Sequence, residues 1–278
     1  MSLRPLLLLS LLAPLGAQAQ SFAEQVLELT NDERWNNGQL PPLKGHVQLD
    51  AASTLHSTNM GVRDFFMHCD PDTGKGHGTR MSEAGYAWNS AGENIGAGYS
   101  SPAAAMSGWM NSSGHRANIL GSNYNELGVG YFFESSDLAA KRTSTSGCTP
   151  NGSMTGNFRH YWTQNFGRRS GAYPMVIARE DYQTASCNVD LYVYGSGFAT
   201  QMRFSNNGGA TWSAWQAYDA NVRWTLAGTA GATATVHSQI RNGAGTVVDA
   251  SDSIRLATTC GAAGPDPALV FEHGFEAS

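Results

Sequence analysis

Residues 92–120 read GENIGAGYSSPAAAMSGWMNSSGHRANIL, and the rest of the chain is organised around them. A carboxylate, Glu93, stands near the start of this stretch, and an imidazole, His115, stands near its end. Ser101 and Pro102 are typical of an N-cap and a first helical residue, so a helix of small residues is expected between the two. The stretch can therefore bring Glu93 and His115 onto one wall of a cleft.

The first 19 residues have the composition of a secretory signal peptide. Arg4 supplies the positive n-region, residues 6–15 form the apolar h-region, and residues 17–19 (AQA) match a small-residue cleavage pattern. The apolar run is shorter than the roughly 18 residues of a membrane span, and no later stretch is long and apolar enough for one. We expect a secreted, extracellular protein that is periplasmic only in transit and has no stable membrane span.

Charge and length limit the partners and the architecture. The formal net charge of −5 argues against nucleic acid or an anionic membrane as the main partner. The 278 residues exceed a usual single core, so two domains are expected. We predict a first domain over 21–170, a linker over 171–182, a second domain over 183–262 and a flexible tail over 263–278.

The four cysteines divide evenly between the two predicted domains. Export makes disulfides the expected state of these thiols. Of the possible pairings, the economical choice lies within each half, joining Cys69 to Cys148 and Cys187 to Cys260. A cysteine metal site is disfavoured, because no CxxC spacing occurs.

Periodicity predicts helices and strands in the first domain. Apolar residues at helical spacing indicate a helix over 21–35, and Asp50 has the residue type of an N-cap for a second helix that ends near Phe66. Residues 127–133 (LGVGYFF) and 160–166 (HYWTQNF) have the composition of strands, with a polar loop between them. Helices that flank a few antiparallel strands imply an α+β layered domain.

A set of short motifs carries a family resemblance. The motifs are NDER (31–34), FFMH (65–68), GENI (92–95), WxxSxGHRxNIL (109–120), ELGVGY (126–131) and YWTQNFG (161–167). In the order and spacing of these motifs, the chain resembles the bacterial secreted branch of the CAP superfamily (cysteine-rich secretory proteins, antigen 5 and pathogenesis-related 1 proteins), also called SCP-like. The resemblance implies an α-β-α sandwich with a cleft on one side.

The resemblance also implies cleft residues. Family members commonly carry two histidines and two glutamates in the cleft, and motif by motif these positions correspond here to His68, Glu93 and His115. The second glutamate of animal and plant members follows a tryptophan by three residues, where this chain has Ser112. We assign Glu126, just ahead of the glycine-rich strand, as the substitute.

A divalent cation such as zinc is one occupant that these residue types suit. Neutral imidazoles and carboxylates bind Zn²⁺, and His68, His115 and Glu93 as three ligands would leave a position for water. The three residues are far apart in sequence, however, and no HExxH motif fixes their geometry. A structural role stays open, with Glu93 accepting backbone N–H groups in its turn and His115 capping a helix.

No residue is assigned a catalytic role. Ser112 and Ser113 lie close to His115, but no GxSxG elbow is present and small residues before a helix are typical of caps. His56 is expected to be a partly buried residue of the second helix, and His77 lies in a loop that can reach the mouth of the cleft.

Three other motif residues are expected to support the fold. Arg34 and Arg116 can donate to carbonyls or a carboxylate, and Asn118 can tie a loop to the helix.

The second domain reads as a small all-β sandwich. Short alternating runs are separated by Gly/Asn turns such as NNGG and RNGAG. The pattern resembles immunoglobulin-like or fibronectin-like modules, and its expected role is that of a spacer or an adhesion module. The tail ends in FEHGFE, which resembles C-terminal tags of exported bacterial proteins and is expected either to pack as a strand or to be read by a sorting system.

Taken together, the sequence predicts a two-domain protein that binds rather than turns over its partner. The expected partner in the cleft is an extracellular or envelope ligand, which is lipid-like, envelope-derived or protein, and a divalent cation is a further expected occupant. The alternatives are a metal-dependent extracellular hydrolase or protease with Glu93 as general base, and an adhesion or scaffold protein whose cleft is only structural.

Overall fold

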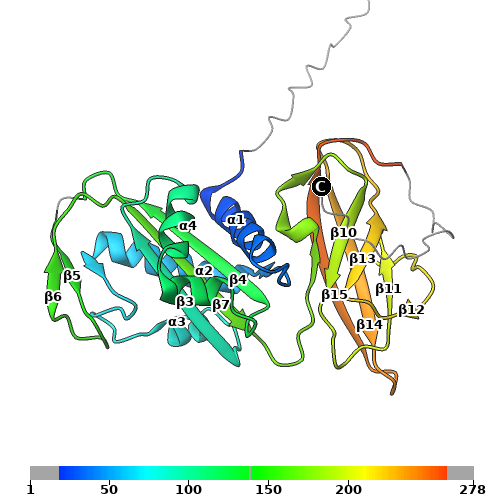
Figure 1. The fold of residues 1–278 in the computed structure, drawn as a ribbon, viewed down its shortest axis with the longest axis horizontal. Helices are drawn as coiled ribbons and strands as arrows, with labels where there is room; N and C mark the ends of the chain where they lie inside the picture. The colour runs from blue at the N-terminus through cyan, green and yellow to red at the C-terminus, as the bar shows by residue number, and fades with distance from the viewer. Residues whose placement is uncertain (1–18, 138, 262–278) are drawn as a thin grey trace, which may run out of the picture.

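The computed structural model describes residues 19–137 and 139–261, which form a helix-and-sheet unit followed by a β-rich unit (Figure 1). The predicted signal peptide, apart from Ala19, and the predicted tail with FEHGFE lie outside the described residues. Within the described part of the chain, no helix is both long and apolar enough to cross a membrane.

The first unit has a four-stranded main sheet in the order β1-β4-β7-β3 and a small sheet in the order β2-β5-β6. In the main sheet β1 is parallel to β4, and the other pairs are antiparallel. The elements are α1 (Phe22–Asn36), β1 (Lys44–Gly45), α2 (Val47–Val62), β2 (Phe65–Phe66), α3 (His77–Glu83), β3 (Ser90–Ala97), α4 (Pro102–Met110), α5 (Ser113–Ile119), β4 (Glu126–Phe133), β5 (Lys141–Thr143), β6 (Gly152–Met154) and β7 (His160–Arg168).

Two of the predicted helix starts are found and one is corrected. Ser21 and Glu24 form a capping box at α1, and Ser101 accepts from the third residue after it at the start of α4. The N-cap of α2 is His46, whose imidazole accepts from a backbone N–H, and not Asp50. Asp50 lies inside the helix, where its carboxylate accepts from the backbone N–H of Val129 at 2.9 Å. The same helix ends at Val62, because the next residues turn to form β2.

The glycines of the ELGVGY motif let α2 lie directly on the sheet. A Cβ atom on Gly128 would stand 2.1 Å from the backbone of Leu49, and one on Gly130 would stand 2.1 Å from the backbone of Ser53. Real Cβ atoms do not approach other atoms so closely, so only glycine fits at these two strand positions. The resulting contact also allows the Ser53 hydroxyl to donate to the Gly128 carbonyl at 3.1 Å.

The central strand β7 carries a buried polar side chain to each neighbouring layer. Asn165 donates to the Ser53 hydroxyl of α2 at 2.9 Å, whereas Gln164, on the opposite face, donates to Thr30 of α1 at 2.9 Å. Successive strand residues face opposite sides, so the two bonds tie the sheet to both helical layers. On the α1 side the layer is completed by an apolar core of Val26, Leu43, Ala105, Met106, Trp109, Ile119, Leu127, Val129, Trp162 and Phe166.

The NDER motif holds the loop after α1. Arg34 is buried and donates to the carbonyls of Pro41, Ile119 and Gly121 at 2.7–2.8 Å. Asn31 both donates to and accepts from the backbone of Leu43, at 3.0 and 2.7 Å. Arg34 therefore has the carbonyl-binding role expected from the sequence.

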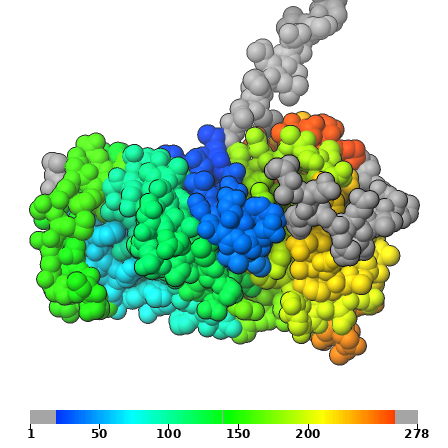
Figure 2. All heavy atoms as spheres, viewed as in Figure 1, coloured from blue at the N-terminus to red at the C-terminus, as the bar shows by residue number. Residues whose placement is uncertain are grey.

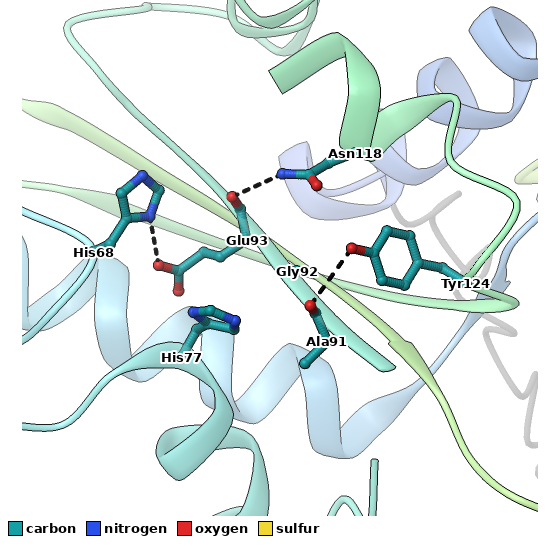
Figure 3. Close-up of a pocket in the computed structure, with 7 residues that line it drawn as sticks. All are labelled: His68, His77, Ala91, Gly92, Glu93, Asn118 and Tyr124. Atoms are coloured by element: carbon teal, nitrogen blue, oxygen red, sulfur yellow. Dashed lines mark hydrogen bonds and ion pairs between the residues drawn. The ribbon is translucent and has the colours of Figure 1, made fainter. Parts of the chain in front are cut away.

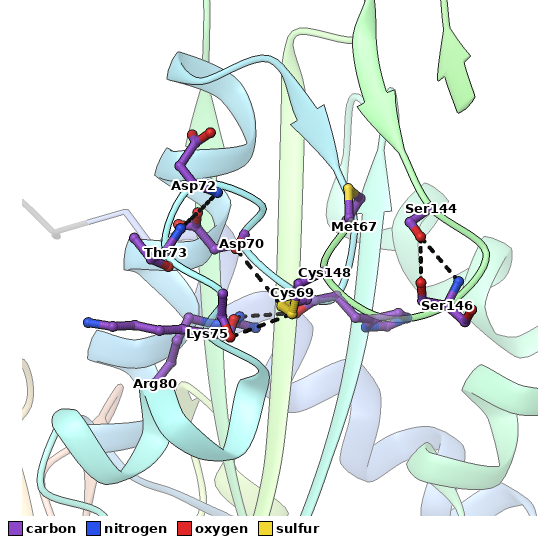
Figure 4. Close-up of a disulfide and its surroundings, with 12 residues drawn as sticks. Met67, Cys69, Asp70, Asp72, Thr73, Lys75, Arg80, Ser144, Ser146 and Cys148 are labelled. Carbon is purple, nitrogen blue, oxygen red and sulfur yellow. Dashed lines mark hydrogen bonds between the residues drawn. A yellow bond between two sulfur atoms is a disulfide. The ribbon is translucent and has the colours of Figure 1, made fainter. Parts of the chain in front are cut away.

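Both predicted disulfides are confirmed, joining Cys69 to Cys148 and Cys187 to Cys260. The first one (Figure 4) fastens the segment after β2 to the segment after β5, and it follows His68 directly in the chain. A turn built on Asp70 lies next to it, in which the Asp70 carboxylate accepts from the backbone N–H groups of Asp72 and Thr73 at 3.0 and 3.2 Å. The disulfide and the Asp70 turn, which directly follow His68 in the chain, therefore fix the position of His68.

The second unit is a β-sandwich of two sheets, in the orders β13-β10-β8 and β12-β11-β14-β15-β9. The segment predicted as a linker, 171–182, instead supplies β8 and a 3-10 turn, because Met175 and Ile177 are buried in the core of the sandwich. The elements are β8 (Met175–Ile177), η1 (Ala178–Glu180), β9 (Gln183–Thr184), β10 (Asn188–Val193), β11 (Gln201–Ser205), β12 (Gln216–Ala217), β13 (Asn221–Thr225), β14 (Thr233–Arg241) and β15 (Val247–Leu256).

The two units are in direct contact. Figure 2 shows the residues of α1 and the loop after it, in blue, between the green main-sheet unit and the yellow sandwich. Tyr194 of the sandwich donates to the carbonyl of Pro42 at 3.0 Å, and Lys44 of β1 pairs with Glu180 and Asp252. The sandwich therefore packs against the β1 edge of the main sheet.

Replacing Gly130 by Ala tests the contact between α2 and the sheet. We expect Gly130→Ala to lower the free energy of unfolding by roughly 3 kcal/mol or more, because the new methyl group meets backbone that cannot move aside alone. Urea denaturation followed by circular dichroism measures the change. Gly114→Ala, where a Cβ meets nothing within 4 Å, is the matched control. Equal stability of the two variants would contradict the prediction.

Candidate functional site

A polar cavity of about 320 Å³ opens at the edge strand β3 (Figure 3). Its walls come from the segment after β2, from α3, from β3 itself, and from α5 and the loop after it. Two of the predicted cleft residues, His68 and Glu93, line it together. The lining residues are His68, His77, Ala91, Gly92, Glu93, Asn118 and Tyr124.

Glu93 is the buried centre of this site. It stands opposite Asn165 of β7, so it projects from the face of the sheet that α2 covers. One carboxylate oxygen accepts from the guanidinium of Arg80, and the other is 2.9 Å from Nδ1 of His68. Arg80 also donates to the carbonyls of His68 and Lys75, at 3.0 and 2.7 Å. A single guanidinium therefore joins α3 and the His68 segment to β3.

The charge on Glu93 is stabilised despite its burial. Burial alone would raise the pKa of Glu93, but the nearby His56, the hydrogen bond from His68 and the charge of Arg80 together lower that pKa to about 2. His56 is itself neutral at pH 7, because burial lowers its pKa to about 4. Arg80 is therefore the permanent counter-charge, and Glu93 is a carboxylate at any physiological pH.

His56 lies beneath the site on α2. It is fully buried, its Nε2 is 2.9 Å from the carbonyl of Met67, and the same nitrogen is 4.0 Å from Glu93. A neutral imidazole in this position donates from Nε2 to the carbonyl. Its Nδ1 has no hydrogen-bond partner among the described residues. The sequence predicted a buried helix residue here but not its place under Glu93.

His68 is the part of the site that faces solvent. Its side chain is 55% exposed, whereas the side chain of Glu93 is 1% exposed. Because Nδ1 faces the carboxylate, the proton of the neutral ring resides on Nδ1 and Nε2 is left as an acceptor toward the cavity. The Glu93–His68 pair thus holds Nε2 of His68 in one orientation, where a molecule that enters the cavity can reach it.

The two other histidines near the site have lowered pKa values. Burial is the main cause for both His77, which lines the cavity, and His115 on α5, and His68 lowers the pKa of each further. His115, which was predicted as a cleft residue, is not among the residues that line the cavity. The carbonyl of His115 accepts from Asn94 at 3.1 Å. The lowered pKa values favour the neutral form of both imidazoles at neutral pH.

The GHRxN motif mostly fixes local structure. Arg116 donates to the carbonyl of Met110 at 2.8 Å, and Asn118 donates to the carbonyl of Glu93 and to the side chain of Asn94, at 3.2 and 2.9 Å. Ser112 is the N-cap residue of α5, although its side chain makes no capping bond. These positions agree with the supporting roles expected from the sequence.

The structure does not bring Glu126 to this cavity. Glu126 accepts from Tyr86 at 2.6 Å and from Arg169 at 2.6 and 3.1 Å, and it lines a different cavity of about 670 Å³ between the two units. The physical reason is strand order: β4 pairs with β1 on one side and with β7 on the other, so β7 separates it from the β3 edge. Nearness in sequence to the glycine-rich strand therefore misplaced the second glutamate.

Sequence reasoning also missed Arg80. It lies 13 residues before Glu93, in a helix too short to show a periodic pattern. The only signal is its basic character within an otherwise small and polar segment, HGTRMSE.

The donor set does not fit a preformed metal centre. Among the residues that the structure describes, no group of three or more His, Cys, Asp or Glu side chains is placed to hold a metal ion. Both oxygens of Glu93 already accept hydrogen bonds, and Arg80 already balances its charge. A cation would have to displace the buried guanidinium, which costs several kcal/mol.

Removing the counter-charge tests the site as a structural unit. We expect Arg80→Met to lower the free energy of unfolding by about 3–5 kcal/mol at pH 7, because it leaves a buried carboxylate without a cation. Urea denaturation measures this. The matched control is Arg142→Met, which breaks the exposed pair with Asp72 and should cost less than about 1 kcal/mol. Similar losses in the two variants would show that Arg80 is not specially required.

Zinc titration tests the metal ligands. After chelator treatment, we expect calorimetry to show no stoichiometric Zn²⁺ binding that distinguishes the wild type from His68→Ala/His115→Ala, because Glu93 is already neutralised. One-to-one binding that is present in the wild type and lost in the double variant would contradict this expectation.

Comparison with known proteins identifies the family of the first unit. The model of the CAP family, described as the cysteine-rich secretory protein family, matches residues 27–166. The chain is similar to the uncharacterized protein YkwD of Bacillus subtilis (strain 168), with 36% identity over 115 residues, which are 41% of this chain and 44% of that protein. The uncharacterized membrane protein YlbC of the same organism is 36% identical over 107 residues, which are 38% of this chain and 30% of that protein.

Among solved structures, an extracellular protein containing an SCP domain from Bacillus anthracis strain Ames is 30% identical with a TM-score of 0.41, and the match covers 53% of this chain and 40% of that one. The chain spans less than half the length of each of these relatives. Because the family model matches half of the chain, the predicted resemblance is confirmed, and the chain belongs to the cysteine-rich secretory protein (CAP) family.

Proposed function

We propose that this protein acts outside the cell and binds a polar ligand in the β3-edge cavity, with His68 as the contact that orients it. The observation that carries the proposal is the Glu93–His68 pair at 2.9 Å, with a buried carboxylate beneath and an exposed ring above. Glu93 fixes the tautomer, so Nε2 of His68 accepts a hydrogen bond from a hydroxyl or amide of the ligand.

The lining favours a polar group over an acyl chain. Besides the imidazoles and Glu93, the wall offers the amide of Asn118 and the hydroxyl of Tyr124. The N–H groups of Asn118 and the hydroxyl of Tyr124 already donate within the protein, which leaves their oxygens as acceptors beside Nε2 of His68. A lipid tail would bury these acceptors without hydrogen bonds, which costs about 1–3 kcal/mol for each group. Of the three ligand classes considered, an envelope-derived sugar or peptide therefore fits the cavity better than a lipid-like molecule.

The geometry disfavours the metal-dependent hydrolase. That mechanism assigned the general base to Glu93, but a carboxylate with a pKa of about 2 and two hydrogen-bonded oxygens is a weak base at neutral pH. The scaffold alternative would leave the site purely structural. It offers no reason for the exposed and oriented nitrogen of His68.

Two observations support an extracellular location. Both disulfides join cysteines within one unit, and disulfides persist in oxidising compartments. The predicted signal peptide also agrees with export.

The experiment is calorimetric titration of the mature protein with soluble peptidoglycan fragments, which are disaccharide-peptides that carry hydroxyls and amides. We expect binding by the wild type and at least a roughly tenfold weaker affinity for His68→Ala, which corresponds to the loss of one hydrogen bond of about 1.4 kcal/mol. The matched control is His237→Ala, which removes a histidine on β14 of the sandwich and should retain wild-type affinity.

Equal affinities of the His68→Ala variant and the wild type would reject His68 as the orienting contact. Absence of binding by the wild type would reject this ligand class.

A further inference from the structure

The turn between β8 and β9 has an unusual backbone. Ala178, Arg179 and Glu180 have φ values of 44°, 55° and 68°, so three consecutive residues with side chains lie in the left-handed region. Such residues are strained relative to ordinary backbone, and they persist only where the surroundings compensate. The compensation here comes from the other unit of the protein.

Arg179 and Glu180 each contact the helix-and-sheet unit, which we call the CAP unit. The carbonyl of Arg179 accepts from Asn31 of the NDER motif at 2.8 Å, and its guanidinium lies 5.2 Å from the ring centre of Trp35. The carboxylate of Glu180 accepts from Lys44 of β1 at 2.7 Å and from the backbone N–H of Gly45. The left-handed turn thus aims consecutive groups of the sandwich at α1 and β1.

The charges at this contact do not balance. Lys44 is held between Glu180 and Asp252, at 2.7 and 2.6 Å, and the two carboxylate side chains are only 12% and 4% exposed. Asp252 is fixed from its own side by the backbone N–H of Ile177 at 2.7 Å. Two buried carboxylates therefore share one ammonium, and ionising both leaves an excess negative charge.

We propose that this contact is a proton-dependent latch, which holds the β-sandwich on the β1 edge while Glu180 carries a proton and loosens when Glu180 ionises beside Asp252. With the latch closed, the sandwich is packed against the CAP unit and is not a spacer joined to it only by the chain. It acts at the sheet edge opposite the β3 cavity and is independent of the ligand proposed there.

The titration has the required sign. Burial, followed by the charge of Asp252, raises the pKa of Glu180 from 4.5 to about 7, against the opposing effect of Lys44. A raised carboxyl pKa means that the docked state binds the proton more tightly than the separated state, so docking weakens as the pH rises from 4.5 through 7. Burial opposes the charge of Lys44, but the two carboxylates raise its pKa, so it stays cationic throughout this range.

Other charged groups also face the contact between the two units. Burial raises the pKa of Asp181 on the turn to about 6, so its ionisation adds to the same trend. The groups that face Glu180 or its partners are Lys44 on β1, Asp252 on β15, His46 and Asp50 at α2, Glu28 and Asp32 on α1, and Arg179 and Asp181 on the turn.

The amide of Gly45 provides a direct readout. Its neighbours Lys44 and His46 donate their N–H groups to the carbonyls of Asn125 and Leu127 within the CAP unit, whereas the N–H of Gly45 donates to Glu180 across the contact. Hydrogen exchange at Gly45 therefore reports separation of the units, and exchange at Lys44 and His46 reports loss of β1 itself.

The experiment measures hydrogen exchange of the mature protein by NMR, with rates corrected for the intrinsic effect of pH. Protection at Gly45 should fall several-fold as the pH rises from 5.5 to 7.5, because the raised pKa of Glu180 makes the docked state lose its advantage as the carboxyl ionises. Glu180→Gln, which imitates the protonated acid, should lose much less of the protection at Gly45 between the two pH values than the wild type does. Protection at Lys44 and His46 should not follow Gly45.

Asp190→Asn is the matched control, because it removes a carboxylate of the sandwich whose partner, Arg223, is exposed in the same unit. In this variant, the protection at Gly45 should fall with rising pH as it does in the wild type. The latch is rejected if protection at Gly45 is independent of pH in the wild type, or if Glu180→Gln loses protection as the wild type does. A parallel fall at Lys44 and His46 also rejects it, since β1 would then be unfolding locally.

Discussion

A buried carboxylate with one permanent cation is the interaction on which the β3 edge depends. Glu93 is ionised inside the protein, and such a charge is tolerated only when a partner and hydrogen bonds replace water. Arg80 supplies the charge, and the same guanidinium binds the carbonyls of His68 and Lys75. Arg80 therefore serves both the fold and the site, because the group that neutralises Glu93 also holds the segment that carries the exposed imidazole of His68.

The motifs predicted part of this arrangement and not the rest. His68 and Glu93 were found because each has a fixed place in a motif, and the register of β3 against β7 turns Glu93 toward α2. Arg80 was missed because its short helix carries no periodic signal. Glu126 was misassigned because sequence nearness says nothing of strand order, and β7 lies between β4 and β3.

The backbone of the junction between the two units also could not be predicted from the sequence. Residues 171–182 have the composition of a linker, and no glycine among Ala178, Arg179 and Glu180 signals a left-handed turn. Contacts with Asn31 and Lys44 favour this backbone against its local preference. Tertiary contacts of this kind cannot be predicted from one segment alone, whereas the sandwich strands and both disulfides follow from alternation and cysteine spacing.

The shared motifs mostly hold the sheet, which limits what family membership says about the ligand. Asn31 and Arg34 bind backbone, Asn118 binds β3, and the glycines at 128 and 130 admit α2. Of the residues that line the cavity, His77, Ala91 and Tyr124 lie outside every motif (Figure 3). The motifs therefore supply the oriented imidazole of His68, and under the proposed function the residues outside the motifs would select the ligand.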